Sequence, residues 1–369
     1  MTAYSAAEVV LPCARLAETI EFFTEHLGFR VASIFPADGP RVAVVAGHGL
    51  RVRFEQGRGG DPGVICLRCM GEVPPAITAP NGTRVEFAAA ERPVEIPPLR
   101  AELVVTQPDG EWGAGRAGMG YRDLIPGRYG GRFIASHIRV PHGGPIPDYV
   151  HFHRVRFQII YCRRGTVQLV YEDQGPPFLL AAGELVVQPP GIRHRVLASS
   201  HGVEVIEVTC PAEHETIADP ELALPTARID RSREWPSRSS GPERAGQRFH
   251  WYRVGATPWE RWRVDGFRMR DTGVLAATAG VGTVRVVEPR AGVTEGPASR
   301  HDAELVLLYV LRGGCELRCE GHAPRRLESD ASAAIPAGMM HALAGCTDDL
   351  ELLEVAVPGA FRTTLDAPG

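Results

Sequence analysis

Two short motifs recur in this 369-residue chain at nearly the same offset, and this repeat limits the fold more than any other feature. The pattern H-x4-Q-x6-G that begins at His153 returns 148 residues later as H-x4-V-x6-G at His301. A second pattern, from Gly183 to His194, returns 147 residues later from Asp330 to His341. Two separate motifs that recur at nearly the same offset indicate a duplicated structural unit.

The surroundings of both copies favour β-structure. From about residue 100 the apolar runs are short and are separated by Gly and Pro, a spacing typical of a sandwich or barrel. Residues 213–246 carry Pro, Ser, Arg and Glu with few apolar positions, which indicates a surface connection. We therefore expect one barrel over 100–212, the connection over 213–246 and a second barrel over 247–369.

The first 95 residues have a different pattern. An amphipathic helix is predicted from Arg15 to Leu27, and Gly28 follows as its C-cap. One predicted strand precedes this helix and three follow it, which gives a β-α-β-β-β order. A partial second unit runs from Val64 to Phe87, with Asn81-Gly82 as a hairpin turn. We expect a small α+β domain over 1–95.

Composition excludes several function classes. All 40 basic residues are Arg, so a lysine Schiff base and a G-x-x-x-x-G-K-[ST] phosphate loop are both impossible. A net charge of −4 with Arg spread along the chain argues against a nucleic-acid partner. No apolar run is long enough to span a membrane, and no signal peptide is recognised. Eight scattered Cys indicate reduced thiols and a cytoplasmic location.

Four side chains form the predicted metal site. His151 and His153 lie two apart on a predicted strand, so both imidazoles project to one face. Gln158 begins the next strand, and the turn Pro189-Pro190-Gly191 returns His194 toward the same interior. Three imidazoles and an amide oxygen suit Fe, Ni, Cu, Zn, Co or Mn. We expect one divalent transition metal, with Fe(II) favoured and the other ions open.

These spacings resemble the two motifs of the cupin superfamily. Its patterns G-x5-H-x-H-x3,4-E-x6-G and G-x5-P-x-G-x2-H-x3-N match at all three His, with departures at Pro145, Gln158 and Ala198. With the repeat, the chain resembles a bicupin, and the resemblance implies a mainly β fold of two jelly-roll (double-stranded β-helix) barrels. In the second copy Ser299 and Val306 replace two ligand positions, so we expect that barrel to hold no metal.

The N-terminal region resembles part of the vicinal oxygen chelate (glyoxalase/bleomycin-resistance) superfamily. The resemblance rests on the helix with Gly28-Phe29 after it and on the run from Ala79 to Phe87. Glu86 matches the last metal ligand of that family, whereas Glu8 and Arg53 depart from its ligand pattern. We expect a metal-free structural or interface module, whose exposed sheet suggests a homodimer.

Three functions stay open at this point. The bicupin resemblance favours a metal-dependent dioxygenase acting on a small organic molecule. The neutral Gln158 favours a non-redox cyclase, isomerase or lyase in which the metal acts as Lewis acid. The third alternative is a small-molecule-binding or regulatory protein. Beside the metal we predict Tyr149 for proton transfer or substrate binding, and Arg139, if it points inward, for binding a carboxylate.

Overall fold

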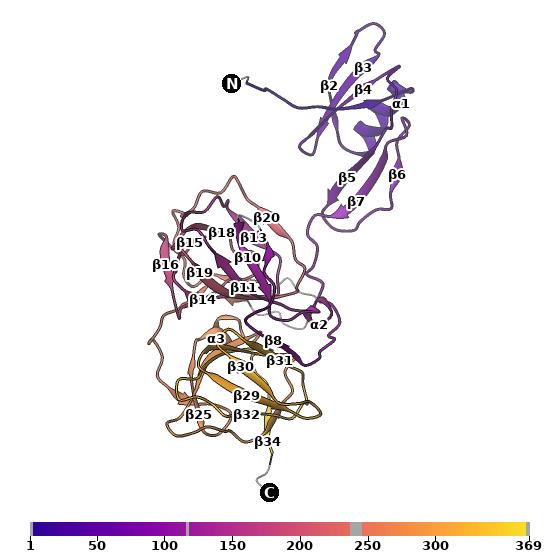
Figure 1. Ribbon diagram of the computed structural model, residues 1–369. Helices are drawn as coiled ribbons and strands as arrows, with labels where there is room; N and C mark the ends of the chain where they lie inside the picture. Colours follow the sequence, from indigo (N-terminus) through magenta and orange to yellow (C-terminus); the bar gives the residue numbers. More distant parts are fainter. Residues whose placement is uncertain (1–2, 116–117, 237–245, 367–369) are drawn as a thin grey trace. The chain divides into compact units, whose positions relative to one another are not determined.

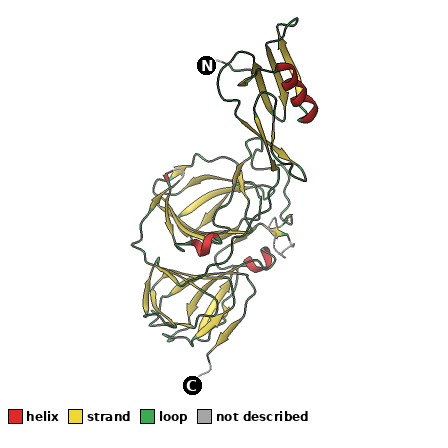
Figure 2. Cartoon of the chain, turned by 90° about the vertical axis from the view of Figure 1, so that its right-hand side faces the viewer, coloured by secondary structure: helices red, strands yellow, loops and turns green. Residues whose placement is uncertain are grey.

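The computed structural model describes residues 3–115, 118–236 and 246–366, and it divides the chain into two compact units, 1–92 and 93–369. Strands make up most of the regular structure, and the few helices are short (Figures 1 and 2). The mainly β fold class predicted from the sequence is therefore confirmed. Among the described residues, no helix has the length and apolar character needed to cross a bilayer.

The N-terminal unit contains the predicted β-α-β-β-β order. Its four-stranded sheet has the order β1-β4-β3-β2, and β1 lies parallel to β4. A second sheet of order β5-β7-β6 contains the predicted hairpin across Asn81-Gly82. The strands are β1 (Val9–Pro12), β2 (Arg30–Phe35), β3 (Val42–Gly47), β4 (Leu50–Glu55), β5 (Val64–Cys69), β6 (Ile77–Thr78) and β7 (Arg84–Ala89).

The predicted helix is present but changes its winding. It is α-helical as α1 (Leu16–Glu21) and continues as a π-helical turn, η1 (Phe22–His26). The Thr24 hydroxyl donates to the Ile20 carbonyl, four residues back, and so competes for an oxygen that the α-helical ladder uses. The apolar stripe still buries Leu16, Phe23 and Leu27, as the periodicity predicts.

The first barrel is built from a seven-stranded and a smaller sheet that face each other. The larger has the order β23-β17-β14-β19-β11-β10-β9, and the smaller β16-β15-β18-β13-β20 with β12 beside β18. The bounds are β9 (Gly113–Ala114), β10 (Gly120–Asp123), β11 (Ile134–Val140), β12 (Gly144–Pro145), β13 (His151–His153), β14 (Phe157–Arg164), β15 (Thr166–Tyr171), β16 (Phe178–Ala181), β17 (Leu185–Val187), β18 (His194–Ser199), β19 (Val203–Cys210), β20 (Thr216–Ala218) and β23 (His250–Tyr252).

The second barrel repeats this plan. Its sheets have the orders β24-β25-β26-β33-β28-β31-β8 and β30-β29-β32-β27-β34. The bounds are β8 (Val104–Thr106), β24 (Glu260–Arg261), β25 (Phe267–Asp271), β26 (Thr283–Pro289), β27 (Ser299–His301), β28 (Leu305–Arg312), β29 (Gly314–Cys319), β30 (Arg325–Glu328), β31 (Ser332–Ile335), β32 (His341–Ala344), β33 (Glu351–Val357) and β34 (Thr363–Leu365). Short elements complete the unit: α2 (Arg128–Gly131), α3 (Val274–Ala277), β21 (Glu234–Trp235) and β22 (Gln247–Arg248).

The strand register confirms the duplication seen in the sequence. Gln158 on β14 pairs with Thr209 on β19. Its counterpart in the second copy, Val306 on β28, pairs with Ala356 on β33, in the equivalent strand pair. The proposed division at 100–212 and 247–369 is crossed twice, because β8 joins the second barrel and β23 joins the first. The predicted connection also contributes β20 to the first barrel. The boundaries at 100–212 and 247–369 therefore remain a prediction, and each barrel takes one strand from the other's range.

The two large sheets share one hydrophobic core. On β14, Ile159 and Tyr161 belong to the same buried cluster as Leu307 and Tyr309 on β28. A polar contact also joins the barrels, since Arg163 pairs with Asp330 at 3.1 Å. Both faces of each large sheet are therefore buried, one toward its own barrel interior and one toward the other barrel.

Candidate metal centre

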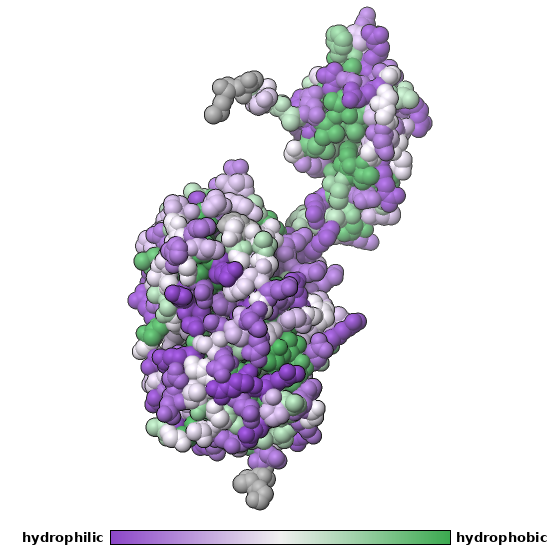
Figure 3. All heavy atoms as spheres, viewed as in Figure 1, coloured by the Kyte–Doolittle hydropathy of each residue, from purple (hydrophilic) through white to green (hydrophobic). Residues whose placement is uncertain are grey.

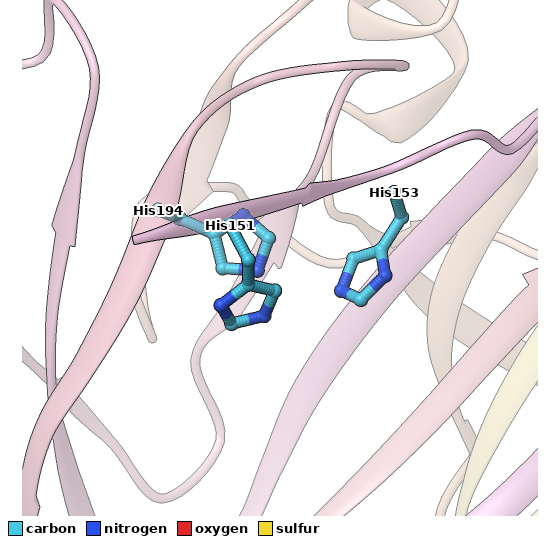
Figure 4. Close-up of side chains that lie close together, drawn as sticks. All are labelled: His151, His153 and His194. Atoms are coloured by element: carbon cyan, nitrogen blue, oxygen red, sulfur yellow. The ribbon is translucent and has the colours of Figure 1, made fainter. Parts of the chain in front are cut away.

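Two adjacent strands bring three imidazoles together in the first barrel. His151 and His153 extend from β13, and His194 begins β18, where it lies directly opposite His151 in an antiparallel pair (Figure 4). One ring nitrogen from each residue lies within 4.8 Å of the other two. His151 and His194 are buried, and His153 is half-buried. The structure thus assembles the three His that the sequence predicts as ligands.

Hydrogen bonds orient all three rings through their Nδ1 atoms. The Nδ1 atoms of His151 and His194 lie 2.8 and 3.1 Å from the carbonyl oxygens of Tyr149 and Ile192. A carbonyl oxygen only accepts, so both Nδ1 atoms carry the hydrogen, and in this tautomer Nε2 carries the lone pair that binds a metal. His153 Nδ1 lies 3.0 Å from the Thr216 hydroxyl on β20. Such outer partners fix the rings of metal-ligating histidines.

A buried carboxylate supports His151 from behind. Asp148 Oδ1 lies 3.6 Å from His151 Nδ1, and Asp148 Oδ2 accepts the backbone N–H of Val196 at 2.9 Å. The aspartate therefore links the strand that carries His151 to the strand that carries His194.

Gln158 reaches the same cavity from β14, and a residue that the sequence reasoning missed orients it. The Gln158 amide N–H donates to Oε1 of Glu207 on β19 at 2.7 Å. Because a carboxylate accepts only, the amide nitrogen faces Glu207 and the amide oxygen is left for a metal. One signal could have found Glu207: a second glutamate, Glu354, lies 147 residues later, at the offset of the repeat.

The cavity around these groups is small and largely apolar. Its volume is about 110 Å³, below the roughly 150 Å³ of an engineered protein cavity that binds benzene. The lining comprises the four predicted ligands, Glu207, Gln188 and apolar side chains: Met119, Tyr121, Ile138, Val140, Ile146, Ile160, Val167, Leu169, Val196, Val203 and Val205. This size and lining limit a ligand to a small molecule, no larger than about one ring.

Gln188 is a second polar group in this wall. It is 1% exposed, and its amide N–H donates to the Tyr171 hydroxyl at 2.9 Å. Its Oε1 is buried without a hydrogen-bond partner. Since an unsatisfied buried carbonyl is costly, this oxygen is a ready acceptor for a ligand hydroxyl or N–H.

The residues present fit a divalent transition metal. Three donors converge, His151 and His194 are buried, and the Nδ1 atoms of all three histidines make hydrogen bonds. The Glu207 carboxylate accepts a hydrogen bond from Gln158, so it supplies a negative charge one hydrogen bond removed from that ligand. A metal held here would keep its Lewis acidity and still lie near a charge-balancing carboxylate.

The two residues predicted beside the metal occupy different positions. Tyr149 is 49% exposed; its ring lies edge-on to His151 at 5.5 Å and is outside the cavity lining. The role predicted for Arg139 requires an inward side chain, and this condition is not met: its neighbours Ile138 and Val140 line the cavity, and strand alternation points Arg139 the other way. Its exposed guanidinium stacks on Trp112 at 4.0 Å.

The equivalent positions of the second barrel differ as the sequence predicts. Ser299 lies opposite His341 in the register that His151 and His194 occupy in the first barrel. Val306 offers no donor at the position of Gln158. His301 and His341 have ring centroids 5.9 Å apart, and within the described ranges they belong to no group of three metal donors.

Comparison with known proteins finds similarity in structure alone. No family model and no curated protein sequence matches the chain. A salicylate 1,2-dioxygenase from Pseudaminobacter salicylatoxidans matches with a TM-score of 0.54 at 14% identity, over 74% of this chain and 91% of its own. A point mutant of that enzyme in complex with gentisate matches with a TM-score of 0.53 at 14% identity, over 74% of this chain and 88% of its own.

The chain has the two-barrel cupin fold. This finding confirms the architecture expected from the motifs and the repeat. The resemblance of residues 1–95 to the vicinal oxygen chelate superfamily is not confirmed by these comparisons and stays a prediction.

Proposed function

We propose that this chain is a metal-dependent enzyme that oxidises a small organic molecule in the first barrel, in the manner of a dioxygenase. The observation that carries this proposal is the convergence of three oriented imidazoles and the Gln158 amide on one cavity with largely apolar walls. The structural likeness to a salicylate dioxygenase supports it at the level of the fold. Fe(II) is the ion we favour, with Ni, Cu, Zn, Mn and Co as alternatives.

The side chains of the cavity have distinct roles in this proposal. His151, His153, His194 and Gln158 hold the metal, which supplies Lewis-acid or redox chemistry when bound. The apolar walls exclude water and align a ring-sized substrate. Gln188 Oε1 accepts a hydrogen bond from a substrate hydroxyl or N–H, which orients the substrate. Glu207 holds Gln158 in place and accepts a proton at Oε2 when the substrate loses one.

Metal analysis on protein purified without a nickel column is the first test. We expect close to one metal per chain and, with Fe(II), consumption of O2 with a member of a panel of one-ring hydroxylated or enolic acids. His194→Ala should abolish both, and His201→Ala, at an exposed position of the same barrel, should change neither. Substoichiometric metal under all conditions would refute the enzyme proposal, and nearly two metals would refute a metal-free second barrel.

A non-redox function is the second candidate, and Gln158 is the observation that favours it. A neutral amide in place of a carboxylate ligand leaves the full charge of the ion to polarise a carbonyl or enolate. A cyclase, isomerase or lyase of this kind should turn over without O2 and accept Zn(II), Mn(II) or Ni(II). Turnover that stops under nitrogen would exclude this candidate.

The third candidate is a metal-independent binding or regulatory protein. It predicts that ligand binding survives in a His151→Ala, His194→Ala double variant, whose imidazole cluster is destroyed. Loss of binding in this variant, with retained thermal stability, would exclude it. The polar groups Gln188 and Glu207 of the cavity wall remain in the variant, so the comparison isolates the metal ligands.

A homodimer through the N-terminal unit is also a prediction. The edge strand β2 exposes Val31, Ile34 and Phe35, and apolar residues form a visible patch on this unit in Figure 3. We expect Phe35→Asp to convert a dimer into a monomer in sedimentation analysis, whereas a wild-type monomer would contradict the prediction. The cytoplasmic location expected from the eight free thiols stays a prediction as well.

A further inference from the structure

The interior of the second barrel has exchanged neutral groups for charged ones. Strand pairing places Arg285 opposite Glu354, as it places Ser136 opposite Glu207 in the first barrel. A serine of the first barrel is thus replaced by an arginine, beside a glutamate that both copies retain. Val306 stands where Gln158 reaches the predicted metal site, so the second copy has lost one donor and gained a cation.

Glu354 is shared between two guanidinium groups. It is completely buried, and its Oε1 accepts from Arg285 Nη1 at 3.1 Å and from the indole N–H of Trp262 at 3.3 Å. Its Oε2 contacts Nη1 of Arg263 as an ion pair. The side chains of Arg263 and Arg285 are 14% and 16% exposed. One carboxylate therefore faces two cations that are largely removed from water.

The neighbouring histidines do not correct this imbalance. Burial, followed by the electrostatic effects of the neighbouring His341 and Arg263, lowers the pKa of His301 to about 4. Burial also lowers the pKa of His341. Both rings are neutral near pH 7, so the cluster of Arg263, Arg285, Glu354 and the two histidines carries one net positive charge.

This charge borders a cavity of about 420 Å³. Nη1 of Arg263 is taken up by the ion pair with Glu354, whereas its Nε and Nη2 and the Thr363 hydroxyl in the same wall are buried without a hydrogen-bond partner. Aromatic rings flank Arg263, with Trp262 at 4.2 Å and Phe361 at 5.4 Å. Hydrogen-bond donors without a partner therefore lie beside apolar side chains. This combination fits an anion that has an apolar part.

We propose that the second barrel binds a small organic carboxylate, held by Arg263 and Arg285 with its apolar part against Phe361, Trp262 and Met269. A monoanion balances the single net charge, and a planar carboxylate matches the fork of a guanidinium. Burial of two cations against one carboxylate is unfavourable unless a further anion offsets it. This site is separate from the predicted metal centre and does not depend on the function proposed for the first barrel.

Calorimetric titration of the full chain with sodium benzoate in low-salt buffer at pH 7 tests the proposal. We expect saturable binding of benzoate and none of its neutral analogue benzamide. Arg263→Gln and Arg285→Gln should each weaken benzoate at least tenfold. Two matched controls should leave affinity unchanged: Arg268→Gln, which removes an outward arginine paired with Glu288 on the same sheet, and His153→Gln in the first barrel.

Further outcomes would overturn the proposal. These are no saturable benzoate binding at about 10 mM, equal affinity for benzamide, tighter binding of inorganic phosphate, or full affinity in Arg263→Gln. If an arginine variant fails to fold, Glu354→Gln tests the proposal instead. It removes the carboxylate that competes with benzoate for the two arginines and keeps both arginines. This variant should bind benzoate several-fold more tightly, and unchanged or weaker affinity would contradict the proposal.

A readout on the wild-type chain avoids changes to the cluster altogether. The Trp262 indole N–H lies beside the proposed site and donates to Glu354. Its ¹⁵N resonance, identified by its loss in Trp262→Phe, should shift on addition of benzoate and stay in place with benzamide. If the Trp262 resonance does not shift at saturating benzoate, any binding lies elsewhere and the proposed site in the second barrel is wrong.

Discussion

Acidification should destabilise the fold through His301. This histidine is buried, and its surroundings disfavour the second proton that the ring would take up at low pH. Its Nδ1 accepts the backbone N–H of Ala303 at 3.2 Å, so protonation there would break this hydrogen bond. Its Nε2 is buried without a partner and the residue is 3% exposed. Arg263 and His341 lie near enough to oppose a positive charge, and Glu354 compensates them only in part.

The magnitude follows from the two pKa values. Burial lowers the pKa of His301 from 6.5 to about 4, and each pH unit corresponds to about 1.4 kcal/mol. The unfolded chain binds this proton below pH 6.5, whereas the folded chain binds it only below about pH 4. Stability is therefore complete above pH 6.5 and falls by about 3 kcal/mol as the pH drops to 4.

Urea unfolding of metal-free protein at pH 7.5 and pH 4.5 measures this loss. His301→Asn is the informative variant, because the asparagine oxygen can accept the Ala303 N–H and the side chain does not titrate. The variant should lose about 2–3 kcal/mol less than wild type between the two pH values. His322→Asn, at an exposed position of the same barrel, should keep the wild-type loss.

Two results would refute this reasoning. One is an equal loss of stability in wild type and His301→Asn, which would assign acid sensitivity to other groups such as His137 and His341, whose pKa values burial also lowers. The other is an NMR titration in which the His301 ring protonates near pH 6.5 in the folded protein.

Three further predictions concern occupancy, surface and core. His194→Ala should reduce bound metal from about one per chain to near zero, and His341→Ala should not; elemental analysis decides, and equal effects would contradict the assignment of the site. Arg139→Ala should leave kcat/KM unchanged and cost about 1 kcal/mol or less, since an exposed guanidinium on Trp112 contributes little; a large loss of activity would restore its predicted role. Leu307→Ala should cost about 2–5 kcal/mol in urea unfolding, because the side chain is fully buried between the barrels, and a loss below 1 kcal/mol would argue against that shared core.

Local patterns explain the part of this fold that could be predicted. The repeat predicts two barrels because identical spacings generate identical strand pairs, as the registers of Gln158 and Val306 show. The two-residue period of a strand places His151 and His153 on one face, and a Pro-Gly turn directs His194 back to them. These relations depend on neighbours along the chain, so no tertiary information is needed to state them.

The direction of a side chain on the large sheets could not be predicted in this way. Both faces of these sheets are buried, one in a barrel and one between the barrels, and alternation of polar and apolar residues is therefore weak on β14. The role predicted for Arg139 requires an inward side chain, and on β11, where Ala135 to Ile138 are all buried, burial does not alternate and so does not show which residues face the cavity. The exchange of β8 and β23 between the barrels was equally invisible, because strands of either barrel look alike in sequence.

The sequence by itself thus determined the duplication, the strand content and the three imidazoles of one candidate metal centre. Only the tertiary structure decided which groups surround them: Glu207 behind Gln158, and Glu354 between two arginines. The physical reason is that hydrogen bonds and charge pairs join strands that are distant in the chain, where pairing is set by sheet topology and burial. Spacing along the chain is enough to predict the metal ligands, whereas packing across the sheets determines which charged groups surround them.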